Sequence, residues 1–210
     1  MEIVNMDTWK RAEIFNFYQN VDYPFFSVSF KVDITKFVQR LKDASLPFYH
    51  SMIFAVATAA NNIDAFRYRV VGDDVVKFDI IHPSFTENTD DYDLFKIVFI
   101  ELGTDLRSFV SRAQDADSNQ TSFLEADGKF RKDVYYMTSI PWVPFMQFTN
   151  PVSLNHDDIV PRFAWGKYMK ENDALMMPIS LQLHHSITDG MHAGLFYEAF
   201  NEYLQKDTAL

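Results

Sequence analysis

Residues 178–195, Pro178-Ile-Ser-Leu-Gln-Leu-His-His-Ser-Ile-Thr-Asp-Gly-Met-His-Ala-Gly-Leu195, decide the fold. Ile179, Leu181 and Leu183 alternate with polar residues, and this period of two predicts a strand with one buried face. A polar run ends the alternation, and Gly190 then permits a sharp bend. Beyond the bend, apolar residues recur with the period of an amphipathic helix. A strand therefore delivers two histidines and an aspartate to a strand-to-helix turn, and such loops often carry reactive groups.

The residues of this turn allow three interpretations. A histidine titrates near neutrality, so it is able to take a proton from a hydroxyl or thiol and return it later. Alternatively, the two histidines are partly buried and bonded to the backbone, and Asp189 caps the helix that begins near Met191. The third interpretation is a metal site, because His185, Asp189 and His192 fall at i, i+4 and i+7. The glycine breaks the helix that these offsets require, and no cysteine supports a metal, so we predict none.

The composition is that of a folded, acidic protein. Apolar residues make up 48% of the 210 residues and aromatic residues 16%, which argues against disorder. The net charge of −10 argues against nucleic-acid binding as the function, because phosphate backbones attract basic surfaces. The absence of cysteine fits a reducing compartment. The sequence contains neither a basic, apolar leader nor an apolar run long enough to span a bilayer, so we expect a soluble, cytoplasmic protein and no membrane partner.

Hydrophobic periodicity predicts alternating helices and strands along the chain. Helices are expected at about 8–19, 34–44, 48–63 and 104–116, and strands at 25–32, 66–71, 75–82, 94–101, 134–140, 160–168 and 175–184. Asp7 or Thr8 is expected to cap the first helix, and Asp33 the second. The polar and acidic segment 117–131 is expected to be a surface loop. No repeat or linker divides the chain, so we predict one α/β domain over residues 1–210, built on a large mixed sheet.

The pattern His-His-x-x-x-Asp-Gly, after a strand and before a helix, resembles the active-site motif of the chloramphenicol acetyltransferase family. It also resembles motifs of dihydrolipoamide acyltransferase cores and of peptide-synthetase condensation domains, although 210 residues are too few for a condensation domain. Further segments resemble the chloramphenicol acetyltransferases: Trp9-x-Arg11, the hairpin around 66–74, the run 82–86, Ser139–Val143 and Gly166–Tyr168. These matches run in order from about residue 9 to residue 204. The resemblance implies an α/β two-layer sandwich, with helices packed on one face of a large mixed β-sheet.

The resemblance implies specific catalytic roles. In that family the second histidine of the pair, here His185, is the general base that takes a proton from the acceptor hydroxyl. The hydroxyl then attacks the thioester carbonyl of acetyl-CoA. The aspartate, here Asp189, pairs with the arginine of the first helix, here Arg11, and supports the site. The family's oxyanion-donating serine or threonine corresponds to Gln147, whose amide is longer but also donates hydrogen bonds.

The resemblance also assigns the binding residues. Phe17, Tyr18, Phe26, Phe145 and Ala164 correspond to positions of the acceptor pocket, and Tyr49, Lys167 and Tyr168 to positions along the CoA path. Each aromatic residue among them is equally consistent with core packing. Ala164 replaces a family threonine, and Pro47 replaces a lysine present in some members, which leaves Lys167 as the candidate for the cofactor's phosphate. Met146 and Trp165 are bulky for a pocket that fits chloramphenicol. The family assembles as a homotrimer with active sites between subunits.

Three functional hypotheses follow. The first is a CoA-dependent O-acetyltransferase that acts on chloramphenicol or a related small molecule. The second is an acyltransferase of the same fold with a different acceptor or acyl group, which the changes at Gln147, Ala164 and Trp165 invite. The third is a catalytically weak, ligand-binding homologue in which the histidine loop is structural. Acceptor-dependent release of free CoA distinguishes the enzymes from the binding protein.

Overall fold

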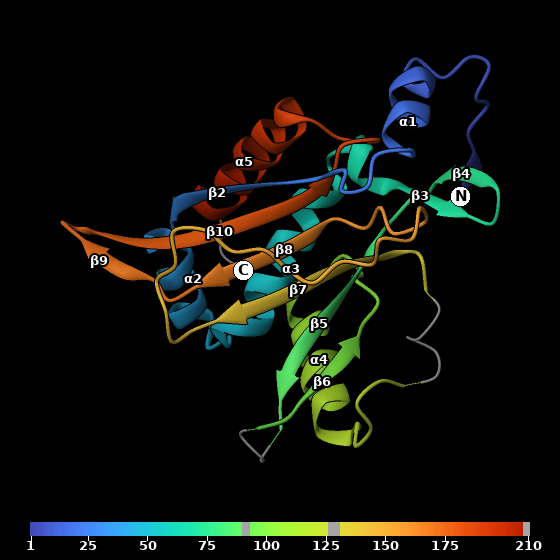
Figure 1. Ribbon diagram of the computed structural model, residues 1–210. Coiled ribbons are helices and arrows are strands. Elements are labelled where there is room, and N and C mark those ends of the chain that lie inside the picture. The colour runs from blue at the N-terminus through green and yellow to red at the C-terminus, as the bar shows by residue number, and fades with distance from the viewer. Residues whose placement is uncertain (90–92, 126–130, 208–210) are drawn as a thin grey trace.

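A seven-stranded sheet dominates the computed structural model, which describes residues 1–89, 93–125 and 131–207 (Figure 1). Its strands are β2 (Phe25–Asp33), β5 (His82–Asn88), β6 (Phe95–Phe99), β7 (Val134–Ile140), β8 (Arg162–Gly166), β9 (Met169–Glu171) and β10 (Ala174–His184). A smaller sheet contains β1 (Glu2–Ile3), β3 (Tyr68–Val71) and β4 (Asp74–Lys77). The helices are α1 (Ala12–Tyr18), α2 (Thr35–Ala44), α3 (Phe48–Asn61), α4 (Leu106–Asn119) and α5 (Gly190–Gln205), with a short 3-10 helix η1 (Asp64–Arg67).

The large sheet is mixed, and the strand that carries the histidines lies inside it. Its order is β2-β10-β8-β7-β5-β6, and β9 pairs with β10. β10 runs antiparallel to both β2 and β8, whereas β7 is parallel to β8 and to β5. Strand β10 is therefore held on both edges along its C-terminal half, which fixes the position of the loop that follows it.

Helices cover one face of this sheet, as Figure 1 shows. Ile179, Leu181 and Leu183 are fully buried in the core cluster on that face, together with most of the alanine-rich helix α3. On the opposite face, the loop after β7 crosses the sheet and bonds to the polar residues of β10. There Ser180 Oγ donates to Phe148 O at 2.7 Å, and Asn150 N donates to Gln182 Oε1 at 2.6 Å. The expected two-layer α/β fold and large mixed sheet are confirmed.

The first helix is shorter than its sequence predicts. The N–H groups of Thr8 and Trp9 both donate to Asn5 O, so a turn occupies the positions where a cap was expected. Helix α1 begins at Ala12, and Arg11, which precedes it, makes no capping bond through its side chain. The prediction of Asp7 or Thr8 as the cap is therefore wrong. Asp33 does bond near the start of α2, where its carboxylate accepts from Thr35 N at 2.9 Å.

Other boundaries differ by a few residues. The hairpin is formed by β3 and β4, and the expected second arm, 75–82, ends early because β5 begins a separate strand at His82. The expected strands 160–168 and 175–184 are joined by the short strand β9. Helix α4 continues to Asn119, into the segment 117–131 that was expected to be a loop, and residues 126–130 of that segment lie outside the described residues.

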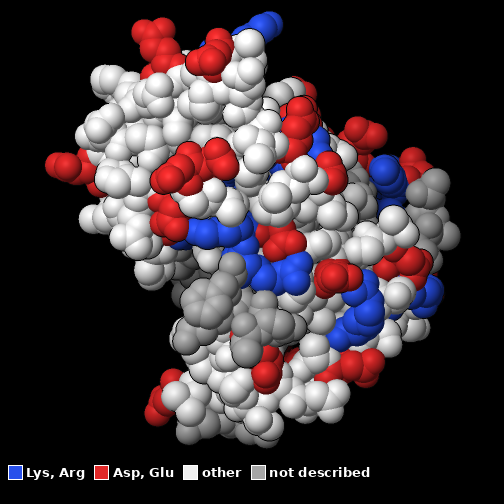
Figure 2. All heavy atoms as spheres, turned by 90° about the vertical axis from the view of Figure 1, so that its right-hand side faces the viewer, with Lys and Arg blue, Asp and Glu red and all other residues white. Residues whose placement is uncertain are grey.

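The surface carries both signs of charge. On the face shown in Figure 2, basic side chains form short groups bordered by acidic ones. The structure contains ion pairs such as Lys132 with Asp157 at 2.5 Å and, largely buried, Arg162 with Asp158, also at 2.5 Å. Within the part of the chain that the structure describes, no helix combines the length and apolarity needed to cross a bilayer.

Candidate active site

The loop between β10 and α5 is a tight turn closed by its own hydrogen bonds. Thr188 N donates to His184 O at 3.1 Å, and Thr188 Oγ1 donates to the same carbonyl at 2.7 Å. Asp189 ends the turn and caps α5, because its Oδ1 accepts from Met191 N at 3.0 Å while its own N–H donates to His192 Nδ1 at 3.1 Å. The helix-cap interpretation of the aspartate is confirmed.

Arg11 braces this loop from the start of α1. Its Nε donates to Ser186 O at 2.9 Å, and its two terminal nitrogens donate to His185 O at 3.1 Å, to Thr188 O at 2.9 Å and to Asp189 Oδ2 at 3.2 Å. The guanidinium thus donates to three carbonyls of the turn and to one carboxylate. A lysine ammonium does not reproduce this, because its donors are not arranged in a fixed planar fork. The expected Arg11–Asp189 contact is present, although most of the bonds go to the backbone.

The ring of His185 is fixed in one tautomer. Its Nδ1 lies 2.9 Å from Thr188 O, and a carbonyl oxygen only accepts hydrogen bonds, so Nδ1 carries the proton of the neutral ring. The lone pair of that neutral ring is therefore on Nε2. Arg11 donates to the same Thr188 carbonyl oxygen, so that one oxygen accepts hydrogen bonds from both the guanidinium and the imidazole.

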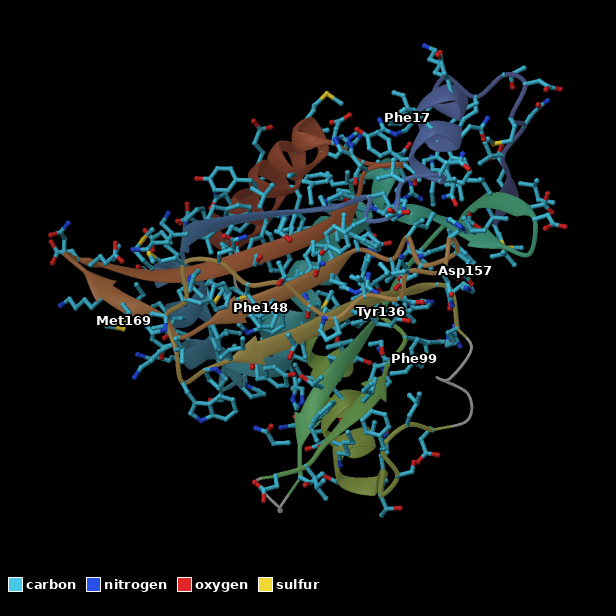
Figure 3. All side chains as sticks on the ribbon, in the orientation of Figure 1. Phe17, Phe99, Tyr136, Phe148, Asp157 and Met169 are labelled. Atoms are coloured by element: carbon cyan, nitrogen blue, oxygen red, sulfur yellow. The ribbon has the colours of Figure 1, made fainter. Side chains whose placement is uncertain are left out.

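Aromatic side chains hold the imidazole in place. Tyr18 of α1 stacks on the His185 ring with centroids 4.5 Å apart and planes at 15°, and Phe26 of β2 contacts it at 5.0 Å. Phe17 meets Tyr18 edge-on at 5.1 Å, and its own side chain is 65% exposed. Three of the residues predicted to form the acceptor wall thus lie around the histidine, and the most exposed one faces away from the core (Figure 3).

His184, the first histidine of the pair, has a different environment. It is 3% exposed, and its Nδ1 accepts from Ser186 N at 3.2 Å and lies 2.7 Å from Ser186 Oγ. Phe25 packs edge-on against its ring at 4.9 Å. Burial lowers the pKa of His184 to about 4, so its neutral form is the one that the fold accommodates.

The carboxylate of Asp189 is kept ionised by its partners. Burial alone acts to raise its pKa, but the hydrogen bond from Arg11, the nearby His192 and the backbone bond from Met191 together hold the pKa below its ordinary value. Asp189 is therefore an anion that joins helix α1 to helix α5 through Arg11. It contacts the loop rather than the imidazole nitrogens of His185.

A cavity of about 460 Å³ lies at the other end of β7 and β8. All three residues predicted along the CoA path, Tyr49, Lys167 and Tyr168, line it. Its remaining walls come from Phe48, Thr86, Glu87, Asn88, Ser139, Pro141, Trp165 and Gly166. Volume and aromatic lining are those of a site for a small molecule. Trp165, which seemed bulky for an acceptor pocket, packs 6.0 Å from Tyr49 beside this cavity.

The cavity and the histidine are far apart within one chain. Trp165 pairs with Ile179, six residues before His185, so the cavity end of β8 lies about 20 Å from His185 at about 3.3 Å per residue of strand β10. In Figure 3, Phe17, which lies near the histidine, and Met169, which follows the cavity residue Tyr168, lie at opposite ends of the large sheet. The structure therefore places Arg11, His185 and Asp189 in one group and the predicted cofactor residues in another.

Three other predicted residues lie on β8 or on the loop after β7. Ala164 is fully buried and faces the loop side of the sheet in register with Ser180 and Thr138. Gln147 is exposed on the loop after β7. Phe145 packs against Gly166, where a Cβ would approach its ring to 2.9 Å. The structure thus places them along the sheet without a hydrogen bond that ties any of them to the His185 ring among the described residues.

Sequence reasoning missed the cavity residue Glu87 and its partner His50, which follows the cavity residue Tyr49 in the chain. Glu87 and His50 form a pair with 2.6 Å between Oε1 and Nε2, and their side chains are 12% and 10% exposed. They belong to β5 and α3, far apart in the sequence, and no motif links them. Among the described residues, no group of three or more His, Asp or Glu side chains has an arrangement that would hold a metal ion.

Known proteins are similar to this chain in sequence over nearly its whole length. Residues 1–201 match the protein family described as chloramphenicol acetyltransferase. The chain is 29% identical over 195 residues to Chloramphenicol acetyltransferase 2 of Escherichia coli, with 92% of each chain covered. It is also 29% identical over 202 residues to Chloramphenicol acetyltransferase of Staphylococcus aureus, covering 95% of this chain and 93% of the relative.

Solved structures give the same result for the fold. A chloramphenicol acetyltransferase superimposes with a TM-score of 0.88 at 26% identity, covering 98% of this chain and 100% of the other. A probable dihydrolipoamide acetyltransferase of Listeria monocytogenes superimposes with a TM-score of 0.71 at 18% identity, with 96% of each chain covered, which shows a shared fold only. The family match over nearly the whole length, together with the braced histidine loop, shows that this chain belongs to the chloramphenicol acetyltransferase family.

Proposed function

We propose that the protein is a CoA-dependent O-acetyltransferase that transfers acetyl from acetyl-CoA to a hydroxyl of chloramphenicol or a related small molecule. The observation that carries this proposal is the contact of His185 Nδ1 with Thr188 O, because it leaves the Nε2 lone pair as a base. Membership of the chloramphenicol acetyltransferase family supports the same chemistry. Chloramphenicol as the acceptor is taken from the names of the relatives. For this chain it is therefore part of the proposal.

In the proposed reaction, Nε2 of His185 takes the proton of the acceptor hydroxyl while the hydroxyl oxygen attacks the thioester carbonyl. The resulting tetrahedral intermediate carries a negative oxygen, and the Gln147 amide is the proposed donor to it. When the intermediate collapses, the carbon–sulfur bond breaks and the imidazolium returns its proton to the leaving thiolate. The acceptor gains the acetyl ester, and free CoA is released. Arg11 and Asp189 position the loop and do not exchange protons.

Acetyl-CoA is proposed to enter through the cavity of about 460 Å³. The aromatic rings of Phe48 and Tyr168, whose centroids lie 5.6 Å apart, offer surfaces on which a planar base stacks. Lys167 supplies the cation for a phosphate group. These features fit a nucleotide-bearing thioester. We propose that the protein acts in the cytoplasm, where acetyl-CoA is present.

A homotrimer with active sites between subunits is part of the proposal. The separation of about 20 Å between His185 and the cavity supports it, because one chain does not bring the base and the donor cavity together. The most exposed residues near the histidine, Phe17 and Met191, are apolar, as an interface requires. Light scattering on the purified protein measures the mass directly. A monomer that retains full activity would contradict the shared site.

The row of hydroxyl groups on the loop side of the sheet favours a second candidate, an acyltransferase with a different acceptor. Ser29 Oγ donates to Ser180 Oγ at 2.9 Å, and Thr86 Oγ1 lies 2.9 Å from Thr138 Oγ1. Ala164 stands between these pairs in register and has no hydroxyl to continue the row. An acceptor that supplies its own hydroxyl or apolar group at this point would fit better than one that depends on a threonine.

Thiol release from acetyl-CoA tests both candidates. The purified protein is mixed with acetyl-CoA, with and without chloramphenicol, and free CoA is measured by its thiol. Release that depends on chloramphenicol supports the first proposal, and release only with other hydroxylated acceptors in a panel supports the second. No release with any acceptor would contradict both and favour a binding protein.

A further inference from the structure

Two neighbouring residues of helix α3 bond to two neighbouring residues of strand β5 beside the cavity of about 460 Å³. His50 Nε2 lies 2.6 Å from Glu87 Oε1, and the Tyr49 hydroxyl donates to Thr86 O. The side chains of His50 and Glu87 are only 10% and 12% exposed. We call these two contacts, His50 with Glu87 and Tyr49 with Thr86, the α3–β5 clasp.

Three members of the clasp line the cavity, and the fourth acts from outside it. Tyr49, Thr86 and Glu87 are lining residues, whereas the His50 ring packs at 5.5 Å from the ring of Tyr49. His50 Nδ1 is buried and has no hydrogen-bond partner among the described residues, so the contact with Glu87 is the only hydrogen bond of this imidazole within them. Any effect of His50 on a bound molecule is therefore transmitted through the cavity wall.

The clasp holds the first turn of α3, which has no other cap. The helix begins at Phe48, and Pro47 before it makes no capping bond through its side chain. Uncapped helix ends carry unpaired N–H groups and fray. Tyr49 and His50 lie in this turn, so their bonds fix it on β5. Phe48 lies in the same turn and packs against Tyr168 with ring centroids 5.6 Å apart, and both rings line the cavity.

We propose that His50 and Glu87 are positioning residues for the thioester donor, because their contact holds the first turn of α3 where its rings meet the bound molecule. This role rests on the proposed function, which assigns the cavity to acetyl-CoA. An Nε2–H group donates to the carboxylate in the neutral ring and in the imidazolium alike, so the clasp requires no particular charge on His50.

Loss of the His50–Glu87 contact is expected to weaken donor binding. The donor then has to order the first turn of α3 as it binds, which lowers its affinity. One hydrogen bond corresponds to roughly 5- to 10-fold in a binding constant, so KM for acetyl-CoA should rise by about that factor. KM for the acceptor and kcat should change by less than about twofold, because His185 lies about 20 Å from the cavity.

Steady-state kinetics and isothermal titration calorimetry with CoA test this role. His50→Phe keeps an aromatic ring but loses the hydrogen bond, and it should raise KM for acetyl-CoA and Kd for CoA together, by roughly 5- to 10-fold. His50→Gln keeps a donor and an acceptor in its amide and should stay within about threefold of the wild type. If His50→Phe does not fold, the double variant His50→Phe/Glu87→Leu measures the same change without an unpaired buried carboxylate.

Asn61→Leu is the matched control at the opposite end of α3. Asn61 Nδ2 donates to Ile81 O at 2.9 Å and Asn61 Oδ1 accepts from Ile81 N at 2.8 Å, which ties the same helix to the residue before β5. Neither residue lines the cavity. The control should lower the midpoint of thermal unfolding at least as much as His50→Phe does, and it should leave KM for acetyl-CoA and Kd for CoA unchanged.

Three results would overturn the positioning role. They are unchanged KM and Kd in His50→Phe or the double variant, an equal rise in His50→Gln, and an equal rise in Asn61→Leu. Thiol release by the wild type separates this failure from failure of the proposed function. A wild type that releases CoA from acetyl-CoA, with variants that keep its KM, contradicts the positioning role alone. A wild type that neither binds CoA nor releases it contradicts both.

Discussion

Replacement of Arg11 by lysine tests the brace on the histidine loop. The guanidinium makes four hydrogen bonds, three of them to the carbonyls of His185, Ser186 and Thr188. Ser186 and Thr188 are fully buried, so water does not easily replace a lost donor. A lysine ammonium keeps the ion pair with Asp189 and one carbonyl. Two carbonyls then lose their partner, at about 1–2 kcal/mol each, so we expect a loss of about 3 kcal/mol.

Urea unfolding followed by tryptophan fluorescence measures this loss. For an m-value of about 3 kcal/mol/M, the midpoint is expected to fall by roughly 1 M, at equal protein concentration for both proteins. Because Thr188 O also anchors the His185 ring, kcat for acetyl transfer should fall about 10- to 100-fold with a smaller change in KM. Arg107→Lys is the control, since Arg107 is exposed and makes one bond, to Ala44 O.

Two outcomes would refute the reasoning about the brace. One is an Arg11→Lys midpoint and kcat equal to those of the wild type. The other is an equal loss of stability in Arg107→Lys, which would show that any arginine-to-lysine change has this effect. A loss of stability with unchanged kcat would separate the two roles and contradict the link between the brace and the imidazole.

Three further predictions concern other positions. The pKa of His184 is lowered from 6.5 to about 4, so between these values the unfolded chain binds more protons and the free energy of unfolding decreases as the pH is lowered. From about pH 7 to about pH 5 the wild type should lose about 2 kcal/mol more than His184→Asn in urea titrations. Gln147→Ser should raise kcat by about tenfold, because a hydroxyl approaches the oxyanion more closely than the longer amide, and a fall in kcat would show that the amide is recruited. Gly166→Ala places a Cβ 2.7 Å from Val143 O and should cost about 1–3 kcal/mol in thermal unfolding, whereas Gly194→Ala, with open space around its Cβ, should be neutral or stabilising.

The histidine strand and its turn could be predicted because their chemistry is local. The alternation of Ile179, Leu181 and Leu183 requires only that one face of β10 is buried, and the structure buries that face. Asp189 caps α5 as a residue of its type does before a helix. The identity of Arg11 as its partner came from the family resemblance, since 178 residues separate the two in the chain.

The remaining differences arise from contacts that no local pattern contains. The start of α1 depends on a turn around Asn5 O, which competes with the capping that Thr8 offers. The pairing of His50 with Glu87 joins α3 to β5 and is fixed only when the sheet and helices assemble. The expected strand 75–82 runs past the end of β4 at Lys77, because the residues between β4 and β5 are rich in apolar side chains.

Acetylation of chloramphenicol by three proteins side by side tests the central claim most directly. Product formation from acetyl-CoA is measured for the wild type, His185→Gln and His184→Asn, the last as a matched control in the neighbouring position. A general base contributes about 10²- to 10⁴-fold, so His185→Gln should lose at least about 10²-fold while His184→Asn stays within about tenfold of the wild type. Equal activity of His185→Gln and the wild type would contradict the assignment of His185 as the base.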